Sequence, residues 1–165
     1  MDISEVRSPQ LFTMYCEILH LLKERGLIRS TNNPVADYAE RLVSTALSLS
    51  LAPKSTTGYD AVDTEGRKYE IKGRRVTHLN KSRQLSAIRG LSHCHFDFLA
   101  GVLFREDFTV LKACLIPHSS VHQFGKFREH VNATIVHLRD SVWDDPEVVD
   151  ITEAVKAAQA ECTSQ

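Results

Sequence analysis

The sequence has no apolar run approaching the roughly 18 residues of a membrane-spanning helix, and no basic-then-apolar signal region at its start. It also shows no internal repeat and no segment whose composition indicates disorder. A membrane protein and a secreted protein are therefore not expected, and we predict a cytoplasmic protein without a membrane partner. Its 165 residues, 42% apolar and 25% charged, are typical of one globular domain.

Paired cysteines are also missing. The chain has no C-x-x-C pair, and its four cysteines are isolated: Cys16, Cys94, Cys114 and Cys162. In a reducing compartment we expect them to be packing residues rather than disulfides or zinc ligands. His93-Cys94-His95 does not predict a metal site, because adjacent residues cannot easily converge on one ion and no second ligand pair lies at zinc-finger spacing.

The chain has almost no net charge, −1 at pH 7, but its charges are unevenly distributed. Residues 67–89 carry eight Lys or Arg and only one acidic residue, whereas residues 140–153 carry six acidic residues and no Lys or Arg. A basic stretch is what a phosphate backbone requires, and a solvated charged face is the alternative. The candidate nucleic-acid-binding residues are Arg74, Arg75, Lys81, Arg83, Gln84 and Arg89.

Residues 58–75, GYDAVDTEGRKYEIKGRR, read as a β-hairpin. Thr64-Glu65-Gly66 predicts a three-residue loop with glycine at the position that needs a positive φ. The resulting register pairs Val62 with Lys68, Ala61 with Tyr69, Asp60 with Glu70, and Tyr59 with Ile71. Cross-strand partners share a face, so one face is predicted to be apolar, and the other to gather Asp60, Glu70 and Lys72.

Two carboxylates at roughly 5 Å between Cβ atoms raise each other's cost of ionisation unless a cation lies between them. Oxygen ligands favour a hard ion, which makes Mg²⁺ the natural cofactor and Mn²⁺ a possible substitute. Beside a metal-bound water and a scissile phosphate, the ammonium of Lys72 can orient the nucleophile or neutralise charge in the transition state.

Asp60, nine further residues and then Glu70-Ile71-Lys72 resemble the motif of the PD-(D/E)XK nuclease superfamily. By this resemblance Asp60, Glu70 and the backbone carbonyl of Ile71 hold the metal, and Lys72 assists the attacking water. Tyr59 stands where the motif has its proline, a position that contacts no metal. The same spacing also occurs by chance in hairpins with a solvated charged face.

In the resembled family, a helix before the hairpin often brings an acidic residue to the metal. Glu40 is the only glutamate in the predicted helix 34–51, so it is the candidate for this supporting catalytic and metal-binding role. Its alternative is a surface position or an ion pair with Arg41. Related nucleases also use a polar residue after the hairpin near the scissile phosphate, and Gln84 is the candidate, or else an ordinary surface glutamine.

Periodicity and capping signals predict the remaining elements. An amphipathic helix 8–25 should begin with Ser8 as N-cap and Pro9 at the first position, and bury Leu11, Met14, Tyr15, Ile18, Leu21 and Leu22. The other predicted elements are helices 34–51, 82–90, 121–131 and 150–160, and strands 96–104, 108–117 and 133–139. Together they predict an α/β fold, a three-layer α/β/α sandwich around a mixed sheet with a restriction-endonuclease-like core.

The predicted organisation is a single nuclease-like domain, residues 1–165. Residues 1–33 form a helical lead-in, residues 34–139 the core that the resemblance covers, and residues 140–165 an acidic segment with a terminal helix. This leaves no room for a separate target-recognition domain. Sequence specificity is therefore expected from loops, from a homodimer that presents one metal centre to each strand of a duplex, or from a separate partner.

The function predicted from these features is Mg²⁺-dependent hydrolysis of phosphodiester bonds in DNA, as in restriction-type endonucleases. Two alternatives stay open. One is a non-catalytic DNA-binding or regulatory module with the same fold, against which the intact Glu70 and Lys72 argue. The other is a nuclease that acts on RNA, since DNA and RNA present the same phosphodiester to the metal.

Overall fold

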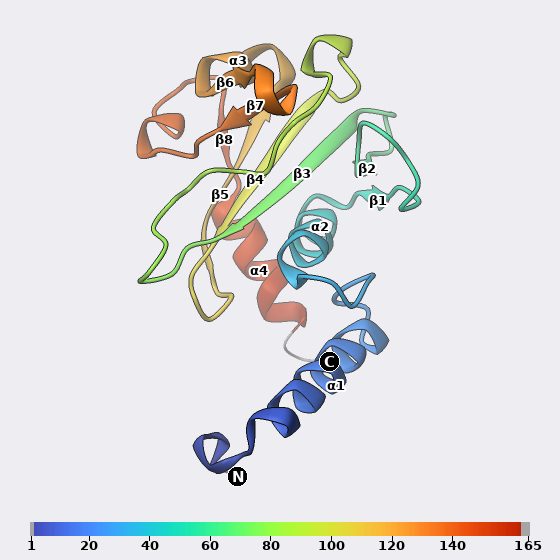
Figure 1. Cartoon of the computed structure of the whole chain (residues 1–165). Coiled ribbons are helices and arrows are strands. Elements are labelled where there is room, and N and C mark those ends of the chain that lie inside the picture. Colours follow the sequence, from blue (N-terminus) through green and yellow to red (C-terminus); the bar gives the residue numbers. More distant parts are fainter. Residues whose placement is uncertain (1, 163–165) are drawn as a thin grey trace.

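The computed structural model describes residues 2–162, so residues 1 and 163–165 of the predicted domain lie outside the described part. A mixed sheet of six strands forms its centre, in the order β1-β2-β3-β4-β5-β8 (Figure 1). These strands are β1 Ser50–Leu51, β2 Ala61–Val62, β3 Lys68–Arg75, β4 Phe98–Phe104, β5 Val110–Pro117 and β8 Val149–Asp150. The helices are α1 Ser8–Glu24, α2 Pro34–Leu47, α3 Val121–Phe124 and α4 Thr152–Cys162, and a second sheet pairs β6 Gly125–Arg128 with β7 Ala133–Val136.

The sheet confirms the predicted α/β class and the mixed strand directions. Strands β1, β2 and β3 form an antiparallel meander, β4 runs parallel to β3, and β5 returns antiparallel to β4. Every residue of β4 after Phe98 is buried, as expected for a central strand covered on both faces. The predicted strands 96–104 and 108–117 are β4 and β5, and the predicted helix 150–160 is α4.

Helices α2 and α4 cover one face of the sheet and form the first half of the core. The side chain of Asn33 accepts a hydrogen bond from the N–H of Val35 at 3.1 Å, which confirms the predicted N-cap of α2. The helix ends at Leu47 rather than at residue 51, because Ser48 adopts a left-handed conformation with φ of 55°. Leu42 of α2 and Val155 of α4 are fully buried against the sheet.

The close packing of α2 on β3 depends on Gly73. A Cβ atom at this position would lie 2.9 Å from both the Cβ of Ala39 and the carbonyl oxygen of Val35 on α2. We expect Gly73→Ala to lower the free energy of unfolding by about 1–3 kcal/mol, the usual cost of overpacking. Urea denaturation measures it, with Gly73→Ala/Ala39→Gly as the control that removes one of the two contacts. An unchanged midpoint for Gly73→Ala would contradict this packing.

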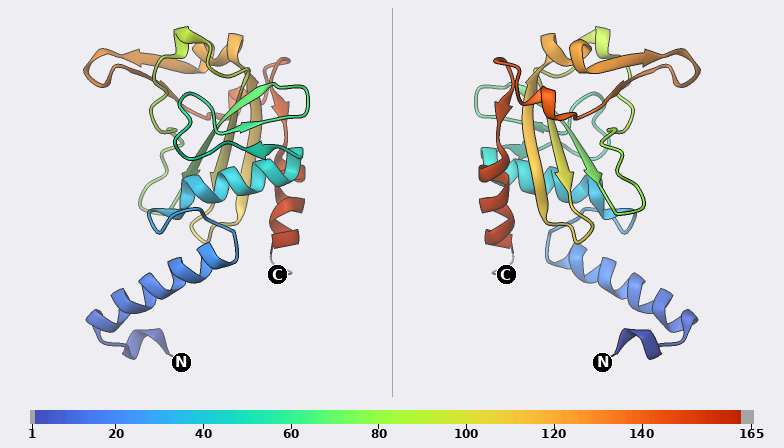
Figure 2. Two further views of the ribbon diagram at one scale, coloured as in Figure 1. Left: turned by 90° about the vertical axis from the view of Figure 1, so that its right-hand side faces the viewer. Right: turned by 90° about the vertical axis from the view of Figure 1, so that its left-hand side faces the viewer.

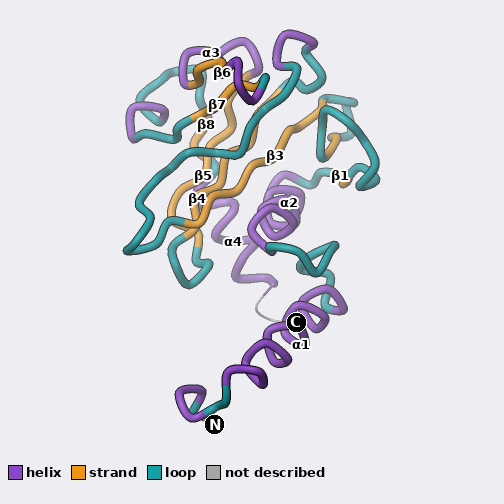
Figure 3. Tube along the Cα trace, in the orientation of Figure 1, coloured by secondary structure: helices purple, strands orange, loops and turns teal. Residues whose placement is uncertain are grey.

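The other face of the sheet is covered mainly by extended chain, which differs from the predicted helical layer. The predicted helix 82–90 is not helical, and the connection from β3 to β4 runs mainly as loop across this face (Figure 3). Within it, Gln84 bridges His137, and Ile88 bridges Thr134. Leu85 and Ile88 are buried, but their N–H groups donate to carbonyls of β7. Apolar residues three apart suit a helix, yet they also suit this chain, which obtains its hydrogen bonds from a neighbouring strand.

Two further predictions on this face are only partly right. The predicted helix 121–131 is a single turn, α3, followed by strand β6. Gly125 ends the turn with an extended backbone, and a Cβ there would lie 2.7 Å from the Cγ2 of Thr134. The predicted strand 133–139 is shorter, and it pairs with β6 instead of joining the main sheet.

Helix α1 forms as predicted, but its apolar stripe is not part of the core. The helix projects away from the sheet (Figure 2). Of the residues predicted to be buried, four are exposed and two are half-buried: Leu11, Tyr15, Ile18 and Leu21, and Met14 and Leu22 respectively. Its N-cap is Arg7 rather than Ser8, and no side chain caps it. The 3.6-residue period establishes an amphipathic helix but does not reveal what its apolar face contacts. No helix among residues 2–162 is long and apolar enough to cross a membrane.

All four cysteines are free thiols. Cys114 is buried in the core, which raises the pKa of its thiol to about 12, and Cys162 is half-buried. Cys16 and Cys94 are exposed, so the predicted packing role is wrong for these two.

Candidate active site

The hairpin between β2 and β3 has the predicted turn and register. Ala61 pairs with Tyr69 and Val62 with Lys68. Gly66 has a φ of 81°, and its N–H donates to the carbonyl of Asp63 at 3.1 Å. The three-residue loop therefore places β3 as the sequence indicates, with Glu70 and Lys72 on one face.

The predicted ladder does not extend beyond Ala61. The backbone bends at Asp60, so the expected pairs of Asp60 with Glu70 and of Tyr59 with Ile71 do not form. Instead, the carboxylate of Asp60 accepts a hydrogen bond from the N–H of Ile71 at 2.7 Å. The side chain thus occupies a position that a strand backbone would take in a regular ladder. Tyr59 consequently packs with the core on the other face, and its predicted place beside Ala61 is wrong.

Glu70 and Lys72 lie next to each other on one face of β3. The ammonium of Lys72 is 2.6 Å from the Oε1 of Glu70, and the side chains of Lys72 and Glu70 are only 19% and 14% exposed respectively. Tyr69 and Ile71 point to the opposite face, into the core beneath α2. The alternation of β3 therefore separates an apolar face from a charged face, as predicted.

The environment of Asp60 is strongly unfavourable to its charge. Burial is the largest cause, and together with the nearby carboxylates of Glu70 and Glu40 it raises the pKa of Asp60 to about 6. The hydrogen bond from Ile71 and the charge of Lys72 act in the opposite direction but do not outweigh it. The site therefore has an excess of negative charge that a bound cation would stabilise.

Glu40 of α2 lies near Asp60, as the resemblance implies. Its carboxylate is buried and forms an ion pair with the guanidinium of Arg29, not with Arg41. Arg29 also donates to the carbonyl of Ala52 at 2.7 Å. Sequence reasoning missed Arg29, because it lies in the irregular segment before α2, where no periodicity indicates where a side chain points.

A cavity of about 190 Å³ opens beside Asp60 and Glu40, with Lys54 and Asp37 on its wall. Burial by itself would raise the pKa of Asp37, but hydrogen bonds from Ser30, from the N–H of Arg29 and from Lys54 together lower it below its ordinary value. Asp37 is therefore an ionised structural residue. Glu70 and Ile71 do not line this cavity, so Asp60 and Glu40 are the only candidate metal ligands of the described chain on its wall.

Within residues 2–162, no three Asp, Glu, His or Cys side chains form a group that could hold a metal ion. The resemblance implies three carboxylates, Asp60, Glu70 and Glu40, and these do not form such a group among the described residues, so Glu40 is not placed as a direct ligand. Two carboxylates and the carbonyl of Ile71 remain. In a β-strand the N–H and C=O of one residue point to the same side. Because the N–H of Ile71 donates to Asp60, its carbonyl faces the same side, past the end of β2. These hard oxygens fit Mg²⁺ or Mn²⁺.

The predicted nucleic-acid-binding residues do not form one surface. Arg74 shares the face of Glu70, and its Nε donates to the carbonyl of Ser82 at 3.0 Å. Arg75 lies on the opposite face, with its guanidinium 4.8 Å from the centre of the Phe108 ring. Arg83 is 2.7 Å from the carboxylate of Asp140. The three other predicted residues, Lys81, Gln84 and Arg89, are exposed on the connection between β3 and β4.

The raised pKa of Asp60 predicts a pH-dependent stability. Because its folded-state pKa of about 6 exceeds the ordinary aspartate value of 3.8, the native state binds more protons between these values. The stability that the protonated carboxyl of Asp60 contributes is therefore fully present below pH 3.8, and it is lost as the pH rises through about 6. In EDTA at pH 8, we expect Asp60→Asn to be more stable than the wild type by roughly 1–3 kcal/mol.

Urea denaturation at two pH values measures this effect. The advantage of Asp60→Asn should shrink at pH 5, where the wild-type carboxyl is largely protonated. The control is Asp63→Asn, because hydrogen bonds from Arg67 and Tyr69 outweigh burial there and lower the pKa of that carboxyl to about 2. Equal stabilities of Asp60→Asn and wild type at pH 8 would contradict the raised pKa.

The chain matches no model of a known protein family and none of the curated proteins with which it was compared.

Proposed function

We propose that the protein is a Mg²⁺-dependent nuclease that hydrolyses phosphodiester bonds of DNA. The observation that carries this proposal is the convergence of Asp60, Glu70 and Lys72 at the end of one hairpin, in surroundings that raise the pKa of Asp60 to about 6. Asp60, Glu70 and the carbonyl of Ile71 are the proposed metal ligands. A bound Mg²⁺ would polarise the scissile phosphate and acidify the attacking water.

Lys72 contributes the second part of the proposed chemistry. Its ammonium is held by Glu70 beside the carboxylates, where a phosphate would approach. From this position it can orient the attacking water by a hydrogen bond and neutralise the negative charge that develops on the phosphate. Glu40 is proposed to support the site from α2, with Arg29 fixing its orientation.

The fold is compatible with this proposal. The resembled superfamily is expected to have a helix, a three-stranded meander and a further strand, and α2, the β1-β2-β3 meander and the parallel strand β4 follow that order. The extended connection between β3 and β4 departs from it, because a helix is expected there. Fold alone does not establish function, so the proposal rests on the site.

The class of substrate is tested by incubating the protein with plasmid, linear duplex, single-stranded DNA and RNA, each with Mg²⁺, Mn²⁺ or EDTA. We expect cleavage of DNA with either metal and none with EDTA. Cleavage of RNA alone would replace DNA as the substrate. Tight DNA binding without cleavage under any condition would favour the non-catalytic binding module.

The placement of Arg74 and Arg75 on opposite faces of β3 predicts different effects on DNA binding. Lys68, Lys72 and Arg74 share the face of Glu70. We expect Arg74→Ala to weaken binding to a duplex and to lower the slope of log K against log salt by about one unit, the effect of one lost phosphate contact.

Fluorescence anisotropy at several salt concentrations measures the slope. Arg75→Ala is the matched control, since it removes the same charge from the next residue on the other face. An equal loss of slope in both variants, or in neither, would place the DNA contact elsewhere.

A further inference from the structure

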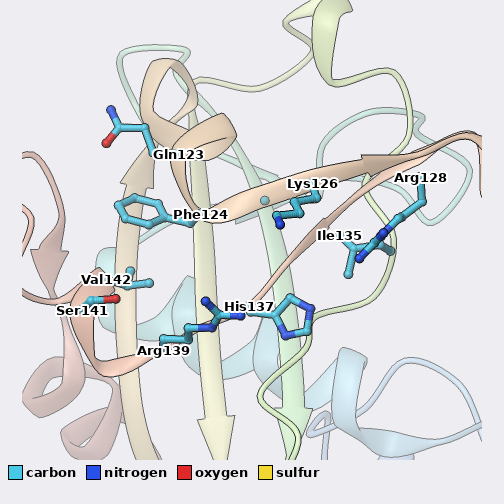
Figure 4. A pocket seen from close by; sticks show the side chains of 10 residues that line it. Gln123, Phe124, Lys126, Arg128, Ile135, His137, Arg139, Ser141 and Val142 are labelled. Carbon is cyan, nitrogen blue, oxygen red and sulfur yellow. The ribbon is translucent and has the colours of Figure 1, made fainter.

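The β6–β7 hairpin has a strongly basic face that the candidate active site does not include. Lys126 pairs with Ile135 in the ladder, so their side chains share a face. Arg128 follows on the same face two residues along β6, and His137 follows two residues after Ile135. Figure 4 shows these side chains, with Arg139, around one cavity of about 200 Å³.

The cations of this cavity lack acidic partners. Among residues 2–162, no Asp or Glu forms an ion pair with Lys126, Arg128 or Arg139, and none lines the cavity. The neighbouring cations differ, because Arg83 and Lys112 lie 2.7 and 3.5 Å from the same carboxylate, that of Asp140. Three like charges around one cavity without a counterion repel each other, and a bound anion would relieve the repulsion.

This basic cavity and the candidate active site lie on the same side of the main sheet. Val136 of β7 belongs to the same buried cluster as Leu99 and Leu103 of β4. In the β3–β4 ladder, Leu99 is the partner of Glu70 and Leu103 the partner of Arg74. The hairpin therefore covers the side of the main sheet that carries Glu70 and Arg74, and its basic side chains, which alternate with Val136, lie on the hairpin face turned away from the sheet.

We propose that the cavity lined by Lys126, Arg128, His137 and Arg139 binds a backbone phosphate of the nucleic acid whose cleavage is proposed above. The inference rests on that proposed function for its ligand and adds a second phosphate site away from the scissile bond. A nucleic acid that spans both sites is held by one phosphate in the cavity of the hairpin. This contact positions another of its phosphodiesters beside Glu70 and Lys72. The group that the cavity recognises is a phosphate. Either a nucleic-acid backbone or free inorganic phosphate could supply it.

The test compares Lys126→Ala/Arg139→Ala with wild type by anisotropy on a labelled DNA duplex in EDTA. Both side chains are exposed, so thermal unfolding should not change. We expect the affinity to fall roughly tenfold or more and the salt slope to fall by about two units. The control, Arg25→Ala/Lys156→Ala, removes the same charge from the end of α1 and from α4, and should retain wild-type binding.

The outcomes separate this inference from the proposed function. An unchanged slope in Lys126→Ala/Arg139→Ala, or a wild type that binds no DNA, overturns the phosphate site. Lost binding in this variant together with a wild type that cuts nothing supports the site and defeats the nuclease proposal. Competition by millimolar inorganic phosphate as effective as that of unlabelled duplex would assign the cavity to free phosphate and overturn its role in nucleic-acid binding.

The exposed face of α1 supports a second, independent inference. Leu11, Phe12, Tyr15, Ile18 and Leu21 are between 37% and 74% exposed, and Leu22 is partly exposed beside them. With roughly 150–250 Å² for each aromatic side chain, this face has ~500 Å² of apolar surface. Two copies would bury ~1,000 Å² of it, the lower limit for a specific interface.

The order of these residues is symmetric about the middle of the helix. A two-fold axis perpendicular to α1, between residues 16 and 17, would relate two antiparallel copies of the helix. It would place each apolar residue of one copy opposite an apolar residue of the other: Leu11 opposite Leu22, Phe12 opposite Leu21, and Tyr15 opposite Ile18. The same face is therefore complementary to itself in an antiparallel pair, the requirement of a two-fold interface. This pairing also opposes the two helix dipoles and sets no like charges directly opposite each other.

We infer that α1 pairs antiparallel with α1 of a second copy of the chain to form a homodimer. Analytical ultracentrifugation at micromolar concentration should give a dimer for the wild type. Phe12→Asp/Ile18→Asp should give a folded monomer, since both side chains face solvent within the chain. Its thermal unfolding should be cooperative and should lose the dependence on protein concentration that a dimer shows. The control Thr13→Asp should stay dimeric, because Thr13 lies outside the apolar set. A monomeric wild type, or a dimer that survives both aspartates, overturns this inference.

Discussion

Glu70→Gln should bind no Mg²⁺ at concentrations that saturate the wild type, and its cleavage of DNA should fall below detection. The substitution keeps the shape of the side chain while it removes the negative charge next to Asp60, so one of only two carboxylate ligands is lost. Mutation of residues that only hydrogen-bond to metal ligands typically lowers metal affinity by roughly 10–100-fold, so loss of a ligand itself should lower it further. DNA binding should survive or improve, because repulsion toward phosphate falls.

Isothermal titration with Mg²⁺ or Mn²⁺ measures the ion affinity, and plasmid cleavage measures the activity. Glu65→Gln is the matched control, since it removes the same charge from the exposed turn of the same hairpin. Wild-type ion affinity in Glu70→Gln would rule out Glu70 as a ligand. Equal losses of ion affinity and cleavage in Glu70→Gln and Glu65→Gln would mean that the charge of Glu70 acts at long range and that Glu70 does not bind the metal directly.

Lys72→Ala should retain the ion but lose turnover by roughly 10²-fold or more, the scale of losing one preorganised donor in the transition state. The ammonium of Lys72 opposes the binding of a cation, so ion affinity should stay equal or rise. The effect belongs to the chemical step, which single-turnover cleavage at saturating Mg²⁺ isolates from binding.

Lys68→Ala is the control for this prediction. Lys68 lies on the same face of β3, two positions before Glu70, and its ammonium is 5.0 Å from the centre of the Tyr59 ring. Its removal should alter DNA binding more than the rate of the bound complex. A Lys72→Ala protein that cuts at the wild-type rate would remove Lys72 from the chemistry.

The hairpin could be predicted because its determinants are local. Gly66 fixes the turn, and the two-residue alternation of β3 fixes which side chains share a face. The bend at Asp60 could not be predicted this way. It arises because the carboxylate of Asp60, in place of a backbone carbonyl, accepts the hydrogen bond from the N–H of Ile71. The pattern of polar and apolar residues is the same for both hydrogen bonds, so it does not predict which one forms.

The connections depend on contacts that are distant in the sequence. Residues 82–90 carry a short helical signal, but Leu85 and Ile88 gain buried positions and strand hydrogen bonds by lying against β7. The partner of Glu40 was missed for the same reason, since Arg29 is brought to it by the fold of an irregular segment. Short amphipathic signals are decided by tertiary contacts more than by propensity.

The most direct test of the central proposal is the cleavage of one labelled DNA duplex by wild type and Glu70→Gln, with binding measured on the same samples as Mg²⁺ is titrated. The proposed function predicts product that rises with Mg²⁺ in the wild type only and disappears in EDTA, while both proteins bind the duplex. A wild type that yields no product at any Mg²⁺ or Mn²⁺ concentration, yet binds the duplex as tightly as Glu70→Gln, would contradict it.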